Sequence, residues 1–177
     1  EAFYETLIGV ERSSGYRDEI RLQISERLLL GLCLGAGSRV DVRGQVRTYN
    51  EETDGRSKLN IVVFAREISE IPEDEQVFYE NEIYLDGHIC KTPIRRTSPL
   101  GREICDIMLA VNRMYNKSDY IPCIAWGRNA SYAGVLDVGM RLTITGRIQS
   151  REYRKKDSFG NSTLHTAYEV SVVKIEG

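Results

Sequence analysis

Aromatic side chains alternate with cationic ones in the second half of this 177-residue chain. Flat rings stack on unpaired bases, and cations beside them contact the phosphates, so this pattern is typical of a surface for single-stranded nucleic acid. Tyr115 and Tyr153 have charged or amide neighbours, which predicts exposed rings in or beside loops. For Tyr120 and Trp126, the spacing fits an ordinary position in a barrel equally well.

The candidate phosphate contacts surround these rings and fill two basic segments. One segment, TPIRRTSPLGRE, is expected to be a turn, and the other, SREYRKK, to be one arm of a hairpin with an Asp-Ser-Phe-Gly tip. A run of charges is usually only a solvated face, but the aromatic residue inside SREYRKK favours a binding arm. The candidates are Lys91, Arg95, Arg96, Arg102, Arg113, Lys117, Arg128, Arg151, Arg154, Lys155 and Lys156.

Catalytic chemistry has no support in the sequence. It contains no phosphate-binding loop, no nucleophile motif and no zinc-hydrolase motif. Four cysteines form no CxxC pair and only two histidines accompany them, which argues against a metal site. Each cysteine has apolar neighbours, which predicts free buried thiols in a reducing cytoplasm. We therefore expect no catalytic residue, no metal, no cofactor and a cytoplasmic location.

Charge is unevenly distributed along the chain, although its net value is only −2. Residues 1–80 carry 10 Lys and Arg against 16 Asp and Glu, a net of −6, whereas residues 81–177 carry 14 against 10, a net of +4. The asymmetry places any polyanion site in the second half, with random surface charge as the alternative. No apolar run is long enough for a membrane span, so no membrane partner is expected.

The two halves of the chain repeat each other. Residues 10–27 align with residues 111–128 at an offset of 101, with five identical positions. At an offset of 102, three further residues recur: Gly37, Arg39 and Gly44 match Gly139, Arg141 and Gly146. A period near 100 residues is too long for a solenoid and fits a duplicated small domain.

Period-two alternation of apolar residues predicts mostly strands, with short helices at 25–34 and 128–136. This order matches the OB-fold, a five-stranded Greek-key barrel. We predict an all-β chain of two tandem OB-folds, at 1–71 and 81–177, joined by an acidic linker at 72–80. Residues 81–101 have no counterpart in the first copy, which predicts a first barrel without its first strand. Upstream residues or another chain would supply that strand.

Residues 81–177 closely resemble the bacterial single-stranded DNA-binding protein family. The most specific segments are LAVNR, DYIPCIAWGRNA and GRIQSREY, in order and at the family's spacing. Two barrels in one chain resemble the tandem members of clostridia, related bacteria or their phages. The resemblance implies binding of single-stranded DNA in replication, recombination and repair, with bases stacked on Tyr115, Tyr120, Trp126 and Tyr153.

Other implications concern the assembly and the first copy. Family members place four barrels around the strand, so a homodimer is expected by analogy. The chain ends without an acidic tail, so protein partners stay unknown. Glu19 and Ser25 stand opposite Tyr120 and Trp126, and we expect the acidic first copy to have lost most DNA contact and to serve packing or subunit association. The alternative is an OB-fold protein-interaction module of a replication or recombination complex.

Overall fold

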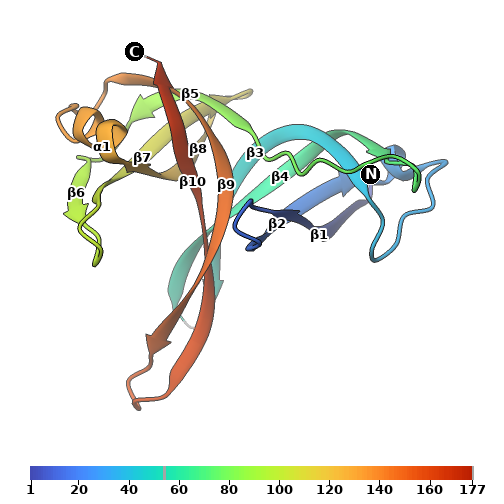
Figure 1. The fold of residues 1–177 in the computed structure, drawn as a ribbon, viewed down its shortest axis with the longest axis horizontal. Coiled ribbons are helices and arrows are strands. Elements are labelled where there is room, and N and C mark those ends of the chain that lie inside the picture. The colour runs from blue at the N-terminus through green and yellow to red at the C-terminus, as the bar shows by residue number, and fades with distance from the viewer. Residues whose placement is uncertain (54, 177) are drawn as a thin grey trace. The chain divides into compact units, whose positions relative to one another are not determined.

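The chain forms two compact units, which we call unit 1 (Glu1–Glu80) and unit 2 (Asn81–Gly177). The computed structural model describes residues 1–53 and 55–176. Strands dominate both units, as the alternation of apolar residues predicts (Figure 1). Among the described residues, no helix is long and apolar enough to cross a membrane.

Unit 2 is a closed barrel. Its strands are β5 (Ile83–Ile89), β6 (Ile94–Thr97), β7 (Glu103–Arg113), β8 (Lys117–Trp126), β9 (Arg141–Lys156) and β10 (Ser162–Glu176). They are ordered β5-β9-β10-β8-β7-β6, and β5 also pairs with β7, so five strands close on themselves and β6 is added at the edge. Only β8 and β10 pair in parallel. This is the OB-fold topology, and it confirms the predicted fold class.

Apolar side chains from alternate positions fill the barrel. Leu109, Ile121, Ile144 and Val170 come from four different strands and are almost completely buried. Burial of each such side chain stabilises the fold by about 1.5–3 kcal/mol. Beyond the barrel, β9 and β10 continue together as a long twisted hairpin (Figure 1).

Two local predictions for unit 2 are corrected by the structure. The basic segment expected to be a turn contains β6, which pairs with β7 from Ile94 opposite Asp106 to Thr97 opposite Glu103. The expected helix at 128–136 is α1 (Gly127–Ala133), which begins earlier and ends at Gly134. A side chain at Gly134 would collide with Arg95, so the end of the helix is packed against β6.

Unit 1 has the same strand order as unit 2, apart from β5 and β6. Its elements are β1 (Phe3–Glu11), β2 (Arg17–Ser25), the 3₁₀ helix η1 (Glu26–Leu29), β3 (Val40–Thr53) and β4 (Arg56–Glu70). Their order β1-β2-β4-β3 matches β7-β8-β10-β9. Among the described residues of unit 1, no strand takes the place of β5, so the sheet stays open between β1 and β3, as expected from the repeat.

The helix predicted at 25–34 is much shorter in the structure. It is the single 3₁₀ turn Glu26–Leu29, whose first turn is capped by the Ser25 hydroxyl accepting from the Arg27 amide at 3.3 Å. Gly31, with φ of +81°, turns the chain away directly afterwards. Cys33 follows in the loop and is exposed, so the expectation of four buried thiols is wrong at this position.

Gly44 and Gly146 recur in the repeat for a reason that the structure makes visible. Each lies at a register shift between two paired strands, close to Phe64 of β4 in unit 1 and to Ser171 of β10 in unit 2. A side chain on either glycine would clash with the carbonyl oxygen of that neighbour. Both positions therefore require glycine for close backbone approach.

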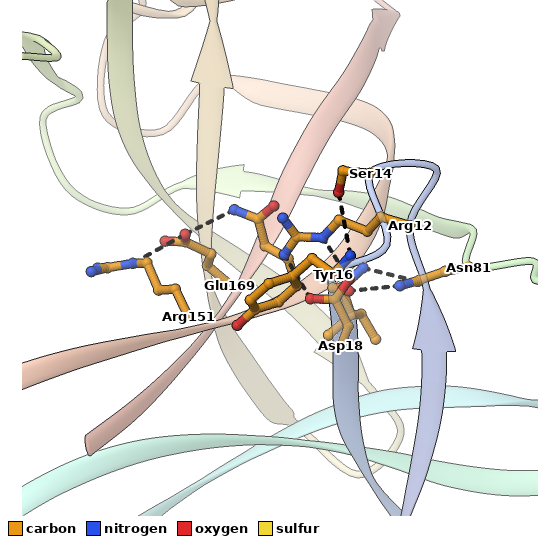
Figure 2. Close-up of polar contacts among 9 residues, drawn as sticks. Arg12, Ser14, Tyr16, Asp18, Asn81, Arg151 and Glu169 are labelled. Carbon is orange, nitrogen blue, oxygen red and sulfur yellow. Dashed lines mark hydrogen bonds and ion pairs between the residues drawn. The ribbon is translucent and has the colours of Figure 1, made fainter. Parts of the chain in front are cut away.

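The acidic segment at 72–80 forms no strand or helix among the described residues. The Arg39 guanidinium donates to the Glu75 carbonyl oxygen at 3.1 Å, and also to that of Pro72. Asn81 then begins unit 2, where its side chain donates to the Ile148 carbonyl at 2.7 Å and accepts from the Ile148 amide at 3.0 Å (Figure 2). The amide side chain thus continues the hydrogen bonding of β5 along β9.

Candidate nucleic-acid interface

Tyr120 and Trp126 lie on the surface of unit 2 that points away from the barrel interior, which we call the outer face. Tyr120 is opposite Ala110 on β7 and alternates with the buried Ile121. Its side chain is 50% exposed, so the barrel-core alternative is wrong for this ring. Trp126 is six residues further along β8 on the same face, and it is half-buried.

Arg102 covers the Trp126 ring. Its guanidinium carbon lies 4.7 Å from the ring centroid, within the range of a cation–π interaction. On β6, which pairs with β7, Arg96 donates to both carboxylate oxygens of Asp106, at 2.7 and 3.2 Å. These hydrogen bonds raise the pKa of Arg96 and fix its plane on the outer face. Two cations thus lie beside the Trp126 end of β8.

A buried carboxylate links β9 and β10 on the same face. Glu169 is almost fully buried and accepts from Gln149 Nε2 at 2.9 Å and from Arg151 Nε at 3.2 Å (Figure 2). The Arg151 side chain keeps 56% of its surface exposed. Glu169 therefore holds Arg151 in place, and the exposed part of the Arg151 guanidinium stays open to a ligand.

Tyr153 follows Arg151 on the hairpin at the next position of the same face. Its ring stacks on His165 of β10, with centroids 5.5 Å apart, and the Arg151 guanidinium lies 6.0 Å from its centroid. His165 also forms a 2.8 Å hydrogen bond with the Thr163 hydroxyl. The ring is half-buried, so the prediction of an exposed Tyr153 is wrong, because His165 stacks on it across the hairpin.

Tyr115 lies in the tight turn between β7 and β8 and is 88% exposed, which confirms the predicted exposed ring. Its φ is +68°, and that of Asn116 is +57°. A bulky residue in the left-handed region costs about 1–3 kcal/mol and commonly marks a functional position. The turn therefore presents the ring to solvent at a cost in backbone free energy.

Two of the predicted phosphate contacts are held in ion pairs away from these rings. Arg113 lies 3.2 Å from the Oδ2 of Asp119, whose side chain is only 2% exposed. Arg95 pairs with Glu103 on the side of β6 that packs under α1. Hydrogen bonds from the Ser131 hydroxyl and from Arg95 hold the pKa of Glu103 below its usual value. Within the described parts of the chain, neither Arg113 nor Arg95 makes a cation–π contact with an aromatic ring.

The other predicted cations are exposed, and no hydrogen bond or ion pair joins their side chains to other described residues. Lys117 begins β8 beside the Tyr115 turn, and Arg128 follows Trp126 in α1. Lys155 is two residues beyond Tyr153, on the same face of the hairpin. The full set is Lys91, Lys117, Arg128, Arg154, Lys155 and Lys156.

Sequence reasoning missed Arg147. It lies on β9 opposite Ser171, at the position before Gln149 and Arg151 on the outer face. It is half-buried and has no hydrogen bond or ion pair to any described residue. The period-two spacing in RIQSR, counted back from Arg151, was the available signal.

A closed five-stranded barrel with rings and arginines on one face defines an OB-fold protein. Comparison with known proteins adds the family. The model of the Single-strand binding protein family matches residues 80–176, and the chain belongs to this family, as its sequence segments predicted.

Individual relatives agree with this assignment. The single-stranded DNA-binding protein of Clostridium tetani is 36% identical over 84 residues, which cover 44% of this chain and 58% of that protein. Single-stranded DNA-binding protein A of Bacillus subtilis is 32% identical over 83 residues, or 43% of this chain and 48% of that protein. The matched region therefore spans only about half the length of these relatives.

A solved structure extends the fold assignment to both units. The wild-type single-stranded DNA binding protein of Thermus aquaticus superposes with a TM-score of 0.73 at 21% identity, covering 98% of this chain and 78% of that one. The match supports a tandem OB-fold architecture.

Proposed function

We propose that unit 2 binds single-stranded DNA with little sequence preference, without catalysis, in support of replication, recombination and repair. The observation that carries this proposal is the outer face, where Tyr120 and Trp126 on β8 share a surface with Arg151 and Tyr153 on β9. Rings of this kind accept any base, because every base has a π-face. The family and the names of the relatives support the same ligand.

Stacking and phosphate contact are coupled at Trp126. Arg102 lies over the ring in the free protein, so a base that stacks there displaces the guanidinium. The displaced cation is then beside the phosphate that follows the base. Trp126 is six positions beyond Tyr120 on β8, about 20 Å along an extended strand, so several nucleotides lie between the two rings.

The carboxylates of the outer face do not oppose a phosphate chain. Asp106 is neutralised by Arg96 and Glu169 by Arg151, and the Gln149 amide also donates a hydrogen bond to Glu169. Arg147 and the exposed lysines and arginines then leave an excess of positive charge. We expect the DNA backbone to follow these cations from β8 toward the hairpin.

Fluorescence of Trp126, the only tryptophan in the chain, tests the proposal. Oligo-dT should quench it and a duplex of equal length should not, at each of two salt concentrations. If about five phosphates are neutralised, the log–log slope against salt should be near −3.5, at about −0.7 per contact. A slope near zero, binding confined to one sequence, or no quenching at low salt would overturn the proposal and favour the protein-interaction module.

The proposal extends to the assembly. A homodimer would provide four OB-folds, one for each of the domains at 1–71 and 81–177 of two chains, with 72–80 as the linker. A soluble cytoplasmic protein associated with replicating DNA fits the function. Light scattering during size-exclusion chromatography tests the stoichiometry, and a monomer at micromolar concentration would contradict it.

A further inference from the structure

Unit 1 has its own cluster of rings and arginines on the outer face of its sheet. In unit 1, Phe64 of β4 is opposite Gln23 of β2. The equivalent pair in unit 2 is Ser171 of β10 and Ile124 of β8. Phe64 therefore lies on the face of unit 1 that corresponds to the outer face of unit 2. The Phe3 ring of β1 lies against it with centroids 5.8 Å apart. The two rings form one continuous apolar surface.

Arginine covers this surface. The Arg47 guanidinium carbon lies 3.9 Å from the Phe64 centroid, closer than Arg102 lies to Trp126 in unit 2. Arg47 of β3 is opposite Val62, which lies on the same face of β4 as Phe64. Arg47 therefore projects over the face that carries the Phe64 ring. A ring capped by a guanidinium is thus present in both units.

A second ring and cation continue the cluster along β3. Tyr49 follows Arg47 at the next position of the face, and Arg21 of β2 donates to its hydroxyl at 2.7 Å. The Phe3 ring is 44% exposed and the Tyr49 ring 37% exposed, so both are accessible. By the pairing of the strands, Tyr49 corresponds to Arg151 in unit 2.

A hollow opens beside the two phenylalanine rings. Phe3, Phe64 and Leu28 form its apolar wall, Arg66 adds a cation, and Arg27 is paired with the Glu1 carboxylate, which also lines the hollow. The Arg66 guanidinium donates to the Gln45 side chain at 3.3 Å, which keeps it on this face. An apolar wall with a cation at its rim fits a stacked base and its phosphate.

We infer that unit 1 carries a second platform for single-stranded nucleic acid, in which Phe3, Phe64 and Tyr49 stack bases and Arg21, Arg47 and Arg66 contact phosphates. The choice of ligand rests on the function proposed for unit 2. The expectation that unit 1 had lost most DNA contact depended on Glu19 and Ser25 of β2 and on the net charge of −6 over residues 1–80. The rings of unit 1 lie instead on β1, β3 and β4.

Photocrosslinking tests the platform in the full chain. Oligo-dT carrying 5-iodouracil is irradiated with the protein, and mass spectrometry identifies the crosslinked peptides. We expect crosslinks at Phe3, Phe64 or Tyr49, and a loss of at least about fivefold in crosslinking yield in Phe64→Leu and Phe3→Leu, since each stacked base contributes at least that factor. Tyr4→Leu is the matched control, because Tyr4 is exposed on the same strand but alternates to the opposite face.

The failure of this inference is distinguishable from that of the proposed function. Trp126 lies in unit 2, so its quenching by oligo-dT reports that unit by itself. Quenching without crosslinks in unit 1 would overturn the second platform, leave the function of unit 2 intact and favour a protein partner for this face. The second platform would also be overturned if Phe3→Leu and Phe64→Leu keep the thermal midpoint of the native chain and crosslink as well as the control Tyr4→Leu.

Discussion

Arg113 and Asp119 form the same ion pair in unit 2 that Arg12 and Asp18 form in unit 1. Arg12 donates to the Asp18 carboxylate at 2.8 and 2.6 Å (Figure 2), and Arg113 Nε lies 3.2 Å from Asp119. Both aspartates are almost completely buried. The pair thus accounts for two of the identities between the repeats by structure, with no need for a ligand.

Replacing Arg113 with alanine should lower stability more than affinity. It leaves the Asp119 carboxylate buried without its cation, which costs about 3–5 kcal/mol. Urea denaturation measures the loss, and Lys117→Ala, on the adjacent exposed position, is the control with a change of about 0.5 kcal/mol or less. Weakened DNA binding at unchanged stability would instead make Arg113 a phosphate contact.

Tyr115→Gly should change stability and affinity in opposite directions. Glycine adopts the φ of +68° without strain, so the free energy of unfolding should rise by about 1 kcal/mol or slightly less. Loss of the ring should weaken DNA binding by about 1–3 kcal/mol. Thermal melts and oligo-dT titrations measure the two effects. Asn116→Gly is the control, which relieves the neighbouring strain and keeps the ring.

Tyr153→Ala should weaken binding of oligo-dT by about 1–3 kcal/mol and change stability by much less, because the ring lies on a hairpin outside the barrel core. His165→Ala removes the ring that stacks on Tyr153 and should cost only part of that affinity. Equal losses in the two variants would mean that His165 itself contacts DNA. Circular dichroism confirms that both variants stay folded.

Thiol reactivity should separate the exposed Cys33 from the buried Cys105 and Cys123. Cys33 is exposed and should react with a disulfide reagent within the mixing time, whereas Cys123 is buried and burial raises the pKa of its thiol. Burial also raises the pKa of Cys105. Both should react only after unfolding in urea. Rapid labelling of Cys123 in the native chain would contradict the packing of β8 against β10.

Acid should weaken the ion pair that Asp86 of β5 forms with Arg141 of β9. Arg141 donates to both carboxylate oxygens of Asp86, at 2.9 and 2.6 Å, and holds the pKa of Asp86 below its ordinary 3.8. Because the folded-state pKa is the lower one, the stabilisation is complete above pH 3.8 and is lost as the pH falls through the folded value. Asp86→Asn should therefore melt earlier than the native chain at pH 7, and the difference in melting temperature should shrink as the pH falls through the folded-state pKa. A constant difference would contradict this linkage.

Much of the fold was predictable from the sequence, because alternation and the repeat report strands and their order. The strand β6 was not, since Arg95 and Arg96 lie between prolines and form a strand only through pairing with β7. The rings of unit 2 lie close together in sequence and could be found. Those of unit 1 could not, because Phe3, Tyr49 and Phe64 come onto one face only when three strands assemble.

The glycines at 44 and 146 set a limit on engineering and also an opportunity. No side chain fits at either glycine, so both residues and the strand geometry around them must be kept in any engineered variant. The outward residues that follow, at alternate positions of β3 and β9, already differ between the units. A designer could therefore transplant one set of outward side chains onto the other sheet and obtain a chain with two identical binding faces on an unchanged backbone.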